Sequence, residues 1–410
     1  MKTQFLPFGV AACCALCTIA NSAFTQNWTN VNLPSFGWQS VASSADGTKL
    51  VAVCVPVQNS PGSIYTSADS GLTWRSNNVP NYFWTSVASS ADGTKLAAVA
   101  SIAGPNDGPI YTSTNSGTNW TLTTATLTNW NCIGSSADGT ILVAGGAELI
   151  GHMGVGSQAA ASLHISTNSG LNWTEIPDLP SVESWNSIVS SANGAIWVAA
   201  ADGVSYTSTN GGTLWNSNKA GLIYSVASSA DGTKLMGAAG NGGGFYSSTD
   251  LGTTWTSNSA PAWGSPQIAS SADGTKLVVV DSYGYPSGGL IYTSTNGGTT
   301  WMVANAGSNF WNAVASSADG SKLVASAGDN GVYTWQSTPS PQLNIAPSSG
   351  NLVVSWVIPS TSFGLQQNCD LTSINWATVT NPPAFNLTNL QNQVILSPPP
   401  GNSFYRLQAQ

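Results

Sequence analysis

The sequence predicts an all-β protein, in which a seven-bladed β-propeller is followed by a small C-terminal β-sandwich-like module. Three observations predict this fold class. Two eight-residue phrases recur between residues 43 and 323, their period is close to 46 residues, and a C-terminal stretch lacks both phrases. A period of about 20 to 50 residues is typical of stacked structural repeats. The length of 410 residues therefore does not imply several unrelated domains.

The chain opens with the layout of a secretory signal peptide. One lysine precedes an apolar run that ends in small residues before Gln26, and we assign residues 1–25 to this signal. We expect export, to the cell surface or into the medium. A lipid-anchored alternative rests on Val10-Ala11-Ala12-Cys13, which is similar to a bacterial lipobox that would acylate Cys13. No later stretch is apolar for long enough to cross a bilayer, so we expect no transmembrane segment.

The phrase Ser-Ser-Ala-Asp-Gly-Thr-Lys-Leu divides the chain into units. Its seven copies have the turn residues Asp46, Asp92, Asp138, Asn193, Asp231, Asp273 and Asp319. In the first unit the strand-like pieces are WQSVASS, KLVAVCV, SIYTS and TWRSNNV. An Asp-Gly pair between apolar runs is a strong hairpin signal, and four short antiparallel strands per unit are typical of a propeller blade. Seven copies therefore predict seven blades within residues 26–336.

The second phrase, seen as STNGGTTW at residues 294–301, marks a turn in every blade but the last. Its six copies end in Trp74, Trp120, Trp173, Trp215, Trp255 and Trp301. Trp28 lies 46 residues before Trp74, in a matching Asn-Trp-Thr. We therefore expect the N-terminal strand to supply the fourth strand of the last blade and to close the ring.

The acidic position of the second phrase indicates a structural role. The residues there are Asp69, Asn115, Asn168, Asn210, Asp250 and Asn296. Asparagine cannot act as a carboxylate acid or nucleophile, yet both residue types cap turns and tolerate left-handed dihedrals. The tryptophans that open the inner strands, such as Trp38 and Trp84, are expected to pack between blades.

The second phrase resembles the Asp box of the sialidase-like propeller superfamily, in register over about residues 27–336. The resemblance implies a scaffold shared by sialidases, xyloglucan-degrading cellobiohydrolases, sortilin-type receptors and photosystem II assembly factors, and no particular chemistry. Sialidases hold their substrate with three arginines, whereas this propeller contains only Arg75. The basic patch of the assembly factors also has no counterpart, so we expect neither of these activities.

The sequence pattern changes after Gln336, where the repeat ends. Residues 337–342 read as a Ser/Pro linker, and residues 343–410 as a separate module with the strand-like pieces LNIAP, NLVVSW, FGLQQN, INWATV, NQVILS and SFYRLQ. Such alternating pieces indicate a small β-sandwich. The module is similar to short C-terminal modules of secreted bacterial proteins and, loosely, to fibronectin type III domains, which implies no activity.

Composition excludes some classes of function. Charged residues make up 6% of the chain, the net charge is −8 and there are two arginines, so nucleic acid is not an expected partner. Five lysines follow a turn aspartate by three residues, and we expect each to balance the charge of its own turn. The mature chain keeps Cys54, Cys132 and Cys369, which lack metal-ligand spacing. We expect no metal and no cofactor.

Candidate site residues lie in the loops that break the repeat. Blade three has the longest, at residues 145–162, followed by residues 175–184. For a catalytic role the candidates are Glu148, Glu175, Asp178 and Glu183, and for ligand binding they are Glu148, His152, Asp202, Asp281, Tyr283 and Tyr285. A solvated insertion in a charge-poor protein explains the same cluster without any function.

Together these features predict an exported, non-catalytic, monomeric propeller that binds a glycan or an extracellular protein. The alternative is a glycoside hydrolase acting on a polysaccharide. Such an enzyme needs two carboxyl groups about 5 to 5.5 Å or about 6.5 to 9.5 Å apart across a cleft.

Overall fold

The computed structural model describes residues 28–34, 37–57, 62–101, 108–148, 160–180, 182–240, 242–282, 288–304, 306–337, 343–357, 363–369, 375–386, 388–389, 391–397 and 403–409. Residues 1–25, assigned to the signal peptide, and Cys13 with them lie outside this description, as does most of the expected linker. The described residues form 34 strands. Nowhere among them is there a helix with the length and apolar character needed to span a bilayer.

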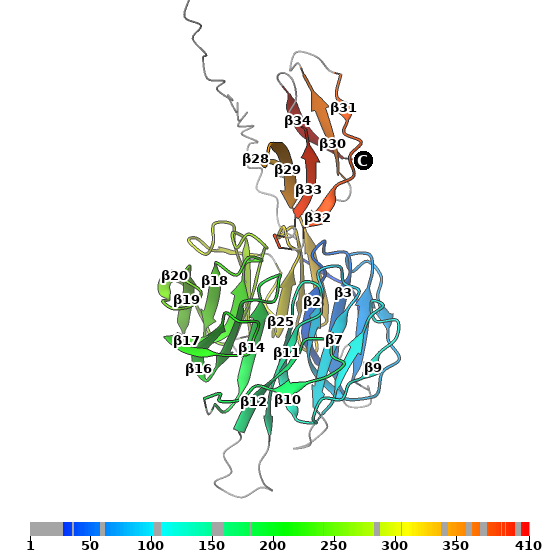
Figure 1. The fold of residues 1–410 in the computed structure, drawn as a ribbon. Helices are drawn as coiled ribbons and strands as arrows, with labels where there is room; N and C mark the ends of the chain where they lie inside the picture. Colours follow the sequence, from blue (N-terminus) through cyan, green and yellow to red (C-terminus); the bar gives the residue numbers. More distant parts are fainter. Residues whose placement is uncertain are drawn as a thin grey trace, which may run out of the picture.

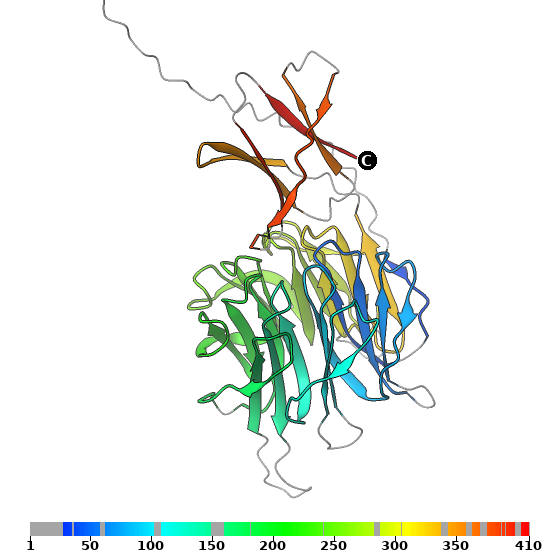
Figure 2. The same cartoon turned by 45° about the vertical axis from the view of Figure 1, so that its right-hand side comes forward.

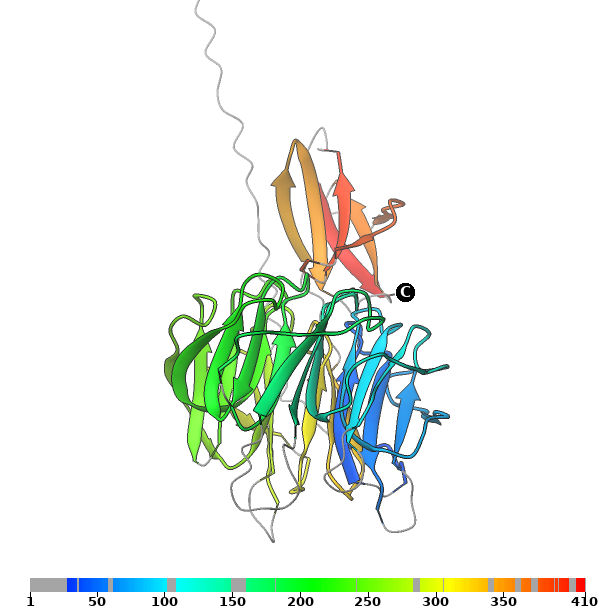
Figure 3. The same cartoon turned by 60° about the horizontal axis from the view of Figure 1, so that its bottom comes forward.

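Consecutive strands pair antiparallel into sheets that follow one another around a ring (Figures 1 and 3). Blade one contains β2 (Gly37–Ser43), β3 (Leu50–Val55), β4 (Ser63–Ser67) and β5 (Arg75–Ser76). Blade two contains β6 (Phe83–Ser89), β7 (Leu96–Ser101), β8 (Ile110–Ser113) and β9 (Thr121–Leu122). Blade three contains β10 (Asn129–Ser135), β11 (Leu142–Glu148), β12 (Ala160–Ser166) and β13 (Thr174–Glu175).

The next sheet has seven strands. They are β14 (Trp185–Ser190), β15 (Trp197–Ala201), β16 (Gly203–Ser208), β17 (Asn216–Ser228), β18 (Leu235–Ala239), β19 (Gly243–Ser248) and β20 (Thr256–Trp263). The start of β17 pairs with β16 and its end with β18. We therefore interpret β17 as the fourth strand of blade four and the first strand of blade five, which divides the sheet into two four-stranded units.

Blade six contains β21 (Pro266–Ser270), β22 (Leu277–Asp281), β23 (Ile291–Ser294) and β24 (Met302–Val303). Blade seven contains β25 (Ala313–Ser316), β26 (Lys322–Ser326), β27 (Val332–Gln336) and, from the other end of the chain, β1 (Thr29–Asn30). Thr29 pairs with Thr334 and Asn30 with Tyr333. Trp28 packs beside Trp311, with ring centroids 6.4 Å apart. The prediction that the N-terminal strand closes the ring is confirmed.

A closed circle of backbone hydrogen bonds joins the inner ends of the blades. The N–H of each alanine in the first phrase donates to the carbonyl of the corresponding alanine in the next copy, with N···O distances of 2.6 to 2.8 Å. The circle, which we call the alanine ring, runs through Ala45, Ala91, Ala137, Ala192, Ala230, Ala272 and Ala318 and returns to Ala45. All seven copies of the phrase take part, so the phrase fixes each blade to both of its neighbours.

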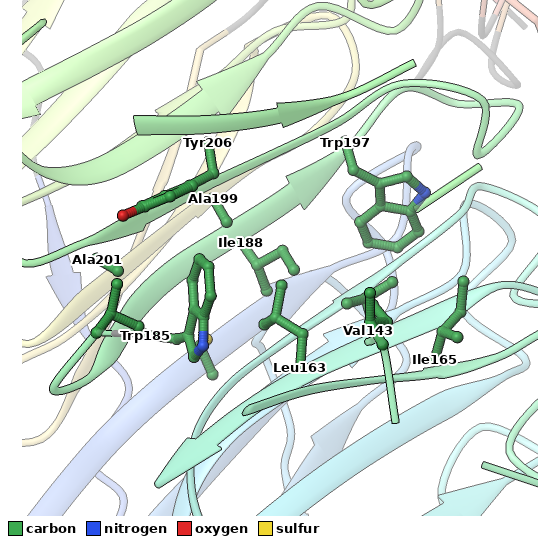
Figure 4. Close-up of a cluster of buried hydrophobic side chains, with 12 residues drawn as sticks. Val143, Leu163, Ile165, Trp185, Ile188, Trp197, Ala199, Ala201 and Tyr206 are labelled. Carbon is green, nitrogen blue, oxygen red and sulfur yellow. The ribbon is translucent and has the colours of Figure 1, made fainter. Parts of the chain in front are cut away.

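Apolar side chains fill the space between adjacent blades. The tryptophans near the start of the inner strands are 0% exposed, and they are Trp38, Trp84, Trp130, Trp185 and Trp311. Figure 4 shows one such cluster, in which Trp185 and Ile188 of blade four lie near Leu163 of blade three. Complete burial assigns these tryptophans to packing between blades and not to a ligand platform.

The outermost strands are shorter than the sequence suggested. We expected TWRSNNV to form the fourth strand of blade one, but β5 holds only Arg75 and Ser76. The outer strands β9, β13 and β24 likewise have two residues each. An outermost strand presents a free edge, and short edge strands limit pairing with other chains.

The C-terminal module is a sandwich of two sheets (Figure 2). One holds β28 (Leu343–Ser348), β29 (Asn351–Val357), β33 (Gln391–Leu396) and β32 (Ala384–Asn386), and the other β31 (Ala377–Thr378), β30 (Phe363–Asn368) and β34 (Phe404–Ala409). Val354, Trp356 and Val394 of the first sheet share a core with Leu365 of the second. Strand β32 was not among the expected pieces, and the domain boundaries remain predictions.

We predict that Trp28→Ala destabilises the whole ring, because it removes a buried indole from the closing blade. The side chain is 9% exposed and packs with Trp311 and Trp335. The expected loss is about 3 to 5 kcal/mol, as for other buried tryptophans, measured by urea unfolding followed by tryptophan fluorescence. Removal of residues 27–33 should act in the same direction.

The matched control is Leu72→Ala, since Leu72 is 82% exposed. This change should alter stability by no more than about 0.5 kcal/mol. An unfolding midpoint that Trp28→Ala leaves in place would show that ring closure does not depend on the N-terminal segment.

Candidate functional site

The second phrase uses its acidic position to hold a turn. In all six copies the side-chain Oδ1 accepts the backbone N–H of the residue four positions later, at 2.8 to 3.0 Å. The serine two positions earlier donates its hydroxyl to the same oxygen, at 2.7 to 3.0 Å. Asp69, Asn115, Asn168, Asn210, Asp250 and Asn296 make the same two bonds, so the acceptor oxygen is the property that the turn uses.

The same phrase contacts the preceding blade. Its glycine has a positive φ in every copy, and at Gly170 this angle is 87°. A Cβ added to Gly170 would lie 2.6 Å from Thr112 Cγ2 of blade two. Glycine is therefore needed both for the turn and for the close approach of neighbouring blades.

His164 of blade three is a packed strand residue. It is 7% exposed, its ring lies 5.1 Å from that of Trp130 in a T-shaped arrangement, and its Nε2 lies 3.2 Å from Ser162 Oγ. The exposed residue Glu175 is its partner in the next strand. Burial lowers the pKa of His164, and the opposing effect of the Glu175 charge is smaller. His164 is therefore neutral near pH 7 and takes the packing position that tyrosines occupy in other blades.

Asp202 holds a loop rather than projecting freely. It lies in the tight turn between β15 and β16 with a φ of 50°. Its Oδ2 accepts the backbone N–H of Glu183 at 2.7 Å. The bond ties the connection between blades three and four to this turn, and it brings two of the sequence-predicted residues together.

Asp281 makes the corresponding contact in blade six. It is 6% exposed at the end of β22, and its Oδ1 accepts the backbone N–H groups of Gly264 and Ser265, each at 3.1 Å. These two residues belong to the connection between blades five and six. The carboxylate therefore satisfies two backbone donors that would otherwise be left without a partner.

Other predicted residues are only partly described. Glu148 ends β11 opposite Ala160, and only its backbone can be placed. His152, Tyr283 and Tyr285 lie outside the described residues. Asp178 is exposed, with a φ of 56°. Within the described part of the chain, no three His, Cys, Asp or Glu side chains group in a way that could hold a metal ion.

The two ends of the ring differ in charge. The loops at one end, which we call the loop face, carry Glu183, Asp202 and Asp281 beside Asp178 and Asp329. The hairpins of the first phrase form the opposite end, the turn face, where six aspartates of the phrase are accompanied by Lys49, Lys95, Lys234, Lys276 and Lys322. The remaining lysine of the ring, Lys219, lies in β17 where this strand passes from blade four to blade five, and so on the loop face. The five carboxylates named above outnumber it, so the loop face is acidic among the described residues.

The turn-face lysines bind the neighbouring blade. Lys49 Nζ donates to Asp92 O at 2.8 Å, and Lys276 Nζ to Asp319 O at 2.7 Å. Burial raises the pKa of Asp92, but bonds from Ser90 and Thr94 and the Lys49 charge together lower it below its usual value. We expected each lysine to balance its own turn. That expectation was wrong for Lys49, because each hairpin packs against the next one around the ring.

Two cavities lie away from these residues. One, of about 470 Å³, is in the C-terminal module and is lined by Gln367, Asn375 and Asn381 among others. The other, of about 180 Å³, is the turn-face end of the central channel, lined by serines and alanines of the first phrase. Sequence reasoning missed the channel, although the doubled serine of every copy was a visible signal.

We predict that Asp250→Asn keeps the fold but removes a pH response. Bonds from Thr254 and Ser248 lower the pKa of Asp250 from 3.8 to about 2. The stabilising effect of this carboxylate is therefore complete above about pH 4 and is lost as the pH falls towards 2. The melting temperatures of the native chain and the variant should differ by a constant amount from about pH 5 to 7 and converge or cross below about pH 4, as measured by circular dichroism.

The reciprocal variant, Asn168→Asp, should gain the acid-side slope that Asp250→Asn loses. Parallel melting profiles for all three chains down to pH 2 would contradict the assigned role of the side-chain oxygen.

Asp281→Ala should lower the free energy of unfolding by about 1 to 3 kcal/mol, because two backbone donors lose their acceptor. Urea unfolding measures the change. Asp178→Asn is the control, since Asp178 is exposed and asparagine tolerates its positive φ. Equal stability of the two variants would show that Asp281 does not hold the connection between blades five and six.

Comparisons with known proteins agree on the fold. Residues 150–271, less than half of the chain, match the family described as "DUF6242 beta propeller domain". The solved structure "YCF48 bound to D1 peptide" is similar with a TM-score of 0.55 and 14% identity, over 78% of this chain and 96% of that one. No curated protein matches the sequence. The match and the neighbour support the resemblance to the sialidase-like propeller superfamily, and this chain is a β-propeller protein.

Proposed function

We propose that the protein is an exported, non-catalytic binding module whose loop face holds a positively charged segment of a partner protein. The observation that carries this proposal is the acidic loop face, which carries Glu183 and Asp202 together with Asp178 and Asp329. A face of one charge attracts and orients segments of the opposite charge.

The contacts of the carboxylates favour binding over hydrolysis. Glycoside hydrolysis uses one carboxyl group as an acid and a second as a nucleophile or base. Asp202 and Asp281 instead accept backbone N–H groups of neighbouring loops. These bonds fix the loops and shape a rigid surface, which reduces the entropy lost when a partner binds.

A protein partner is favoured over a glycan by the structural neighbour. In that structure YCF48 is bound to a D1 peptide. The likeness shows a common fold, and a propeller ring is thus able to present a peptide-binding surface. We extend this only to the class of partner and place the site on the loop face of this chain by its charge.

The test is to incubate the purified mature chain with a displayed peptide library and with a polysaccharide panel, scoring retention and release of reducing ends. We expect retention of lysine- and arginine-rich peptides that weakens with salt, and no release. Release of reducing ends would overturn the proposal, and retention on a polysaccharide alone would replace the protein partner by a glycan.

The test variant combines Glu183→Gln with Asp202→Asn, and the control variant is Asp69→Asn. The first pair removes loop-face charge but keeps the acceptor of the Glu183 N–H bond, and the second removes charge from a hairpin of the ring's outer rim. Peptide affinity should fall about tenfold in the first case, as expected for two lost ion contacts, and stay unchanged in the second.

A further inference from the structure

We propose that the turn-face end of the central channel is a second binding site, which takes the primary ammonium group of a lysine side chain. The cavity there has a volume of about 180 Å³. Every copy of the first phrase contributes its first serine and its alanine to the lining, and the fourth copy also contributes Ser191; the first serines are Ser43, Ser89, Ser135, Ser190, Ser228, Ser270 and Ser316. The site is formed by all blades together, since each contributes at least one hydroxyl and one methyl group.

The channel serines present only acceptor sites to a guest. Each of the seven hydroxyls donates its proton to the carbonyl of the following serine, at 2.6 to 2.9 Å. A hydroxyl has one proton and two lone pairs, so these oxygens have lone pairs left and no proton. An ammonium group is the complement, because it has three donors and no acceptor.

The second serine of each copy has another role, which is to hold the hairpin turn. Ser44 accepts the N–H of Lys49 and donates to Asp46, so it is part of the hairpin turn. The Ser43 hydroxyl instead donates to the carbonyl of Ser44. The turn thus accounts for the second serine of the phrase, whereas the first faces the channel in every copy.

The order of residues along the channel suits an alkyl chain that carries a terminal charge. Ser43 ends β2, and Ala45 lies farther along, in the turn itself. A guest that enters from the turn face therefore passes the alanine methyl groups before it reaches the hydroxyls. Lysine has this layout, since its apolar stem packs against methyl groups while its ammonium group goes further in.

The fixed charges around the turn-face mouth of the channel do not account for its proposed preference for an ammonium group. The turn face carries six aspartates of the first phrase and five lysines. The lysines bind neighbouring turns, as Lys49 and Lys276 do, so the fixed charges nearly cancel. Selection for ammonium therefore comes from the ring of acceptor oxygens. The C-terminal sheets lie on this side of the ring, beyond the end of β27 (Figure 1), so the experiment uses the full mature chain.

The probe is n-butylammonium, which has the stem and charge of a lysine side chain. The mature chain is labelled with ¹³C at alanine methyl groups and titrated by NMR near pH 7. We expect saturable shifts confined to the alanines of the channel, at least about tenfold weaker for n-butanol, because a charged hydrogen bond is stronger than a neutral one. Equal binding of n-butanol or of n-propylguanidinium would overturn the proposal.

The variant test replaces Ser89, Ser190 and Ser270 together. The triple change to alanine should weaken n-butylammonium binding about tenfold, since three acceptors are lost, and the triple change to threonine should restore it. The control replaces Ser76, Ser217 and Ser257 by alanine, three exposed serines on outer strands. A weakened affinity in the alanine triple at an unchanged free energy of unfolding is the readout that a purely structural role of the serines does not predict, and equal affinity in the alanine triple would overturn the site.

A peptide with one central lysine links the site to a protein guest. It should shift the same alanine signals, and the same peptide with an acetylated lysine should not. The amine titration does not depend on the loop face, so its failure leaves the proposed function in place. Loss of cationic-peptide binding at the loop face, with n-butylammonium still bound, would reject the proposed function and not this site.

Discussion

The fold depends on the alanine ring. Seven bonds of 2.6 to 2.8 Å close a circle at the inner ends of the blades, and each of them joins two copies of one phrase. The approach is close enough to dictate side-chain size. A Cβ on Gly47 would lie 2.8 Å from Lys322 Cδ of the preceding blade, and a Cβ on Gly93 would lie 2.8 Å from Lys49 Cβ. Small residues, the Asp-Gly turn and the lysine stem are therefore parts of one interlocking contact.

Most of the ring could be predicted from the repeats, because every blade packs against its neighbours with the same residues at the same positions. Closure by Trp28 followed from its spacing to Trp74 and from the matching Asn-Trp-Thr sequence. The continuous strand β17 could not be predicted, since residues 219–222 carry no strand pattern and remain extended only because β16 and β18 pair with the flanking parts. Strand β32 was missed for a similar reason: its three residues pair with β33 alone.

Less of the candidate site than of the fold could be predicted from the sequence. The mixture of Asp and Asn in the second phrase revealed a turn role, because only the acceptor oxygen is common to both. The partners of Asp202 and Asp281 are backbone N–H groups, which carry no side-chain signature in the sequence. The lysine of each turn was expected to balance its own aspartate, but Lys49 contacts the hairpin of the next blade instead, because adjacent blades pack closely at the turn face.

The two ends of the ring differ in symmetry, and therefore in the kind of partner that each can bind. The loop face differs from blade to blade, so it is able to fix the orientation of an extended partner. The turn face repeats, and a guest on its axis meets the same groups from every side. Two copies of the phrase have isoleucine in place of lysine, at Ile141 and Ile196, yet both keep the channel serine and the alanine. The lysine is thus replaceable in the hairpin contact by another long stem, whereas the first serine and the alanine line the channel in all seven copies. The close approach at the alanine ring keeps the alanine in every copy, and the proposed axial guest would meet one serine hydroxyl from each blade, so that every blade would supply a similar part of its binding energy.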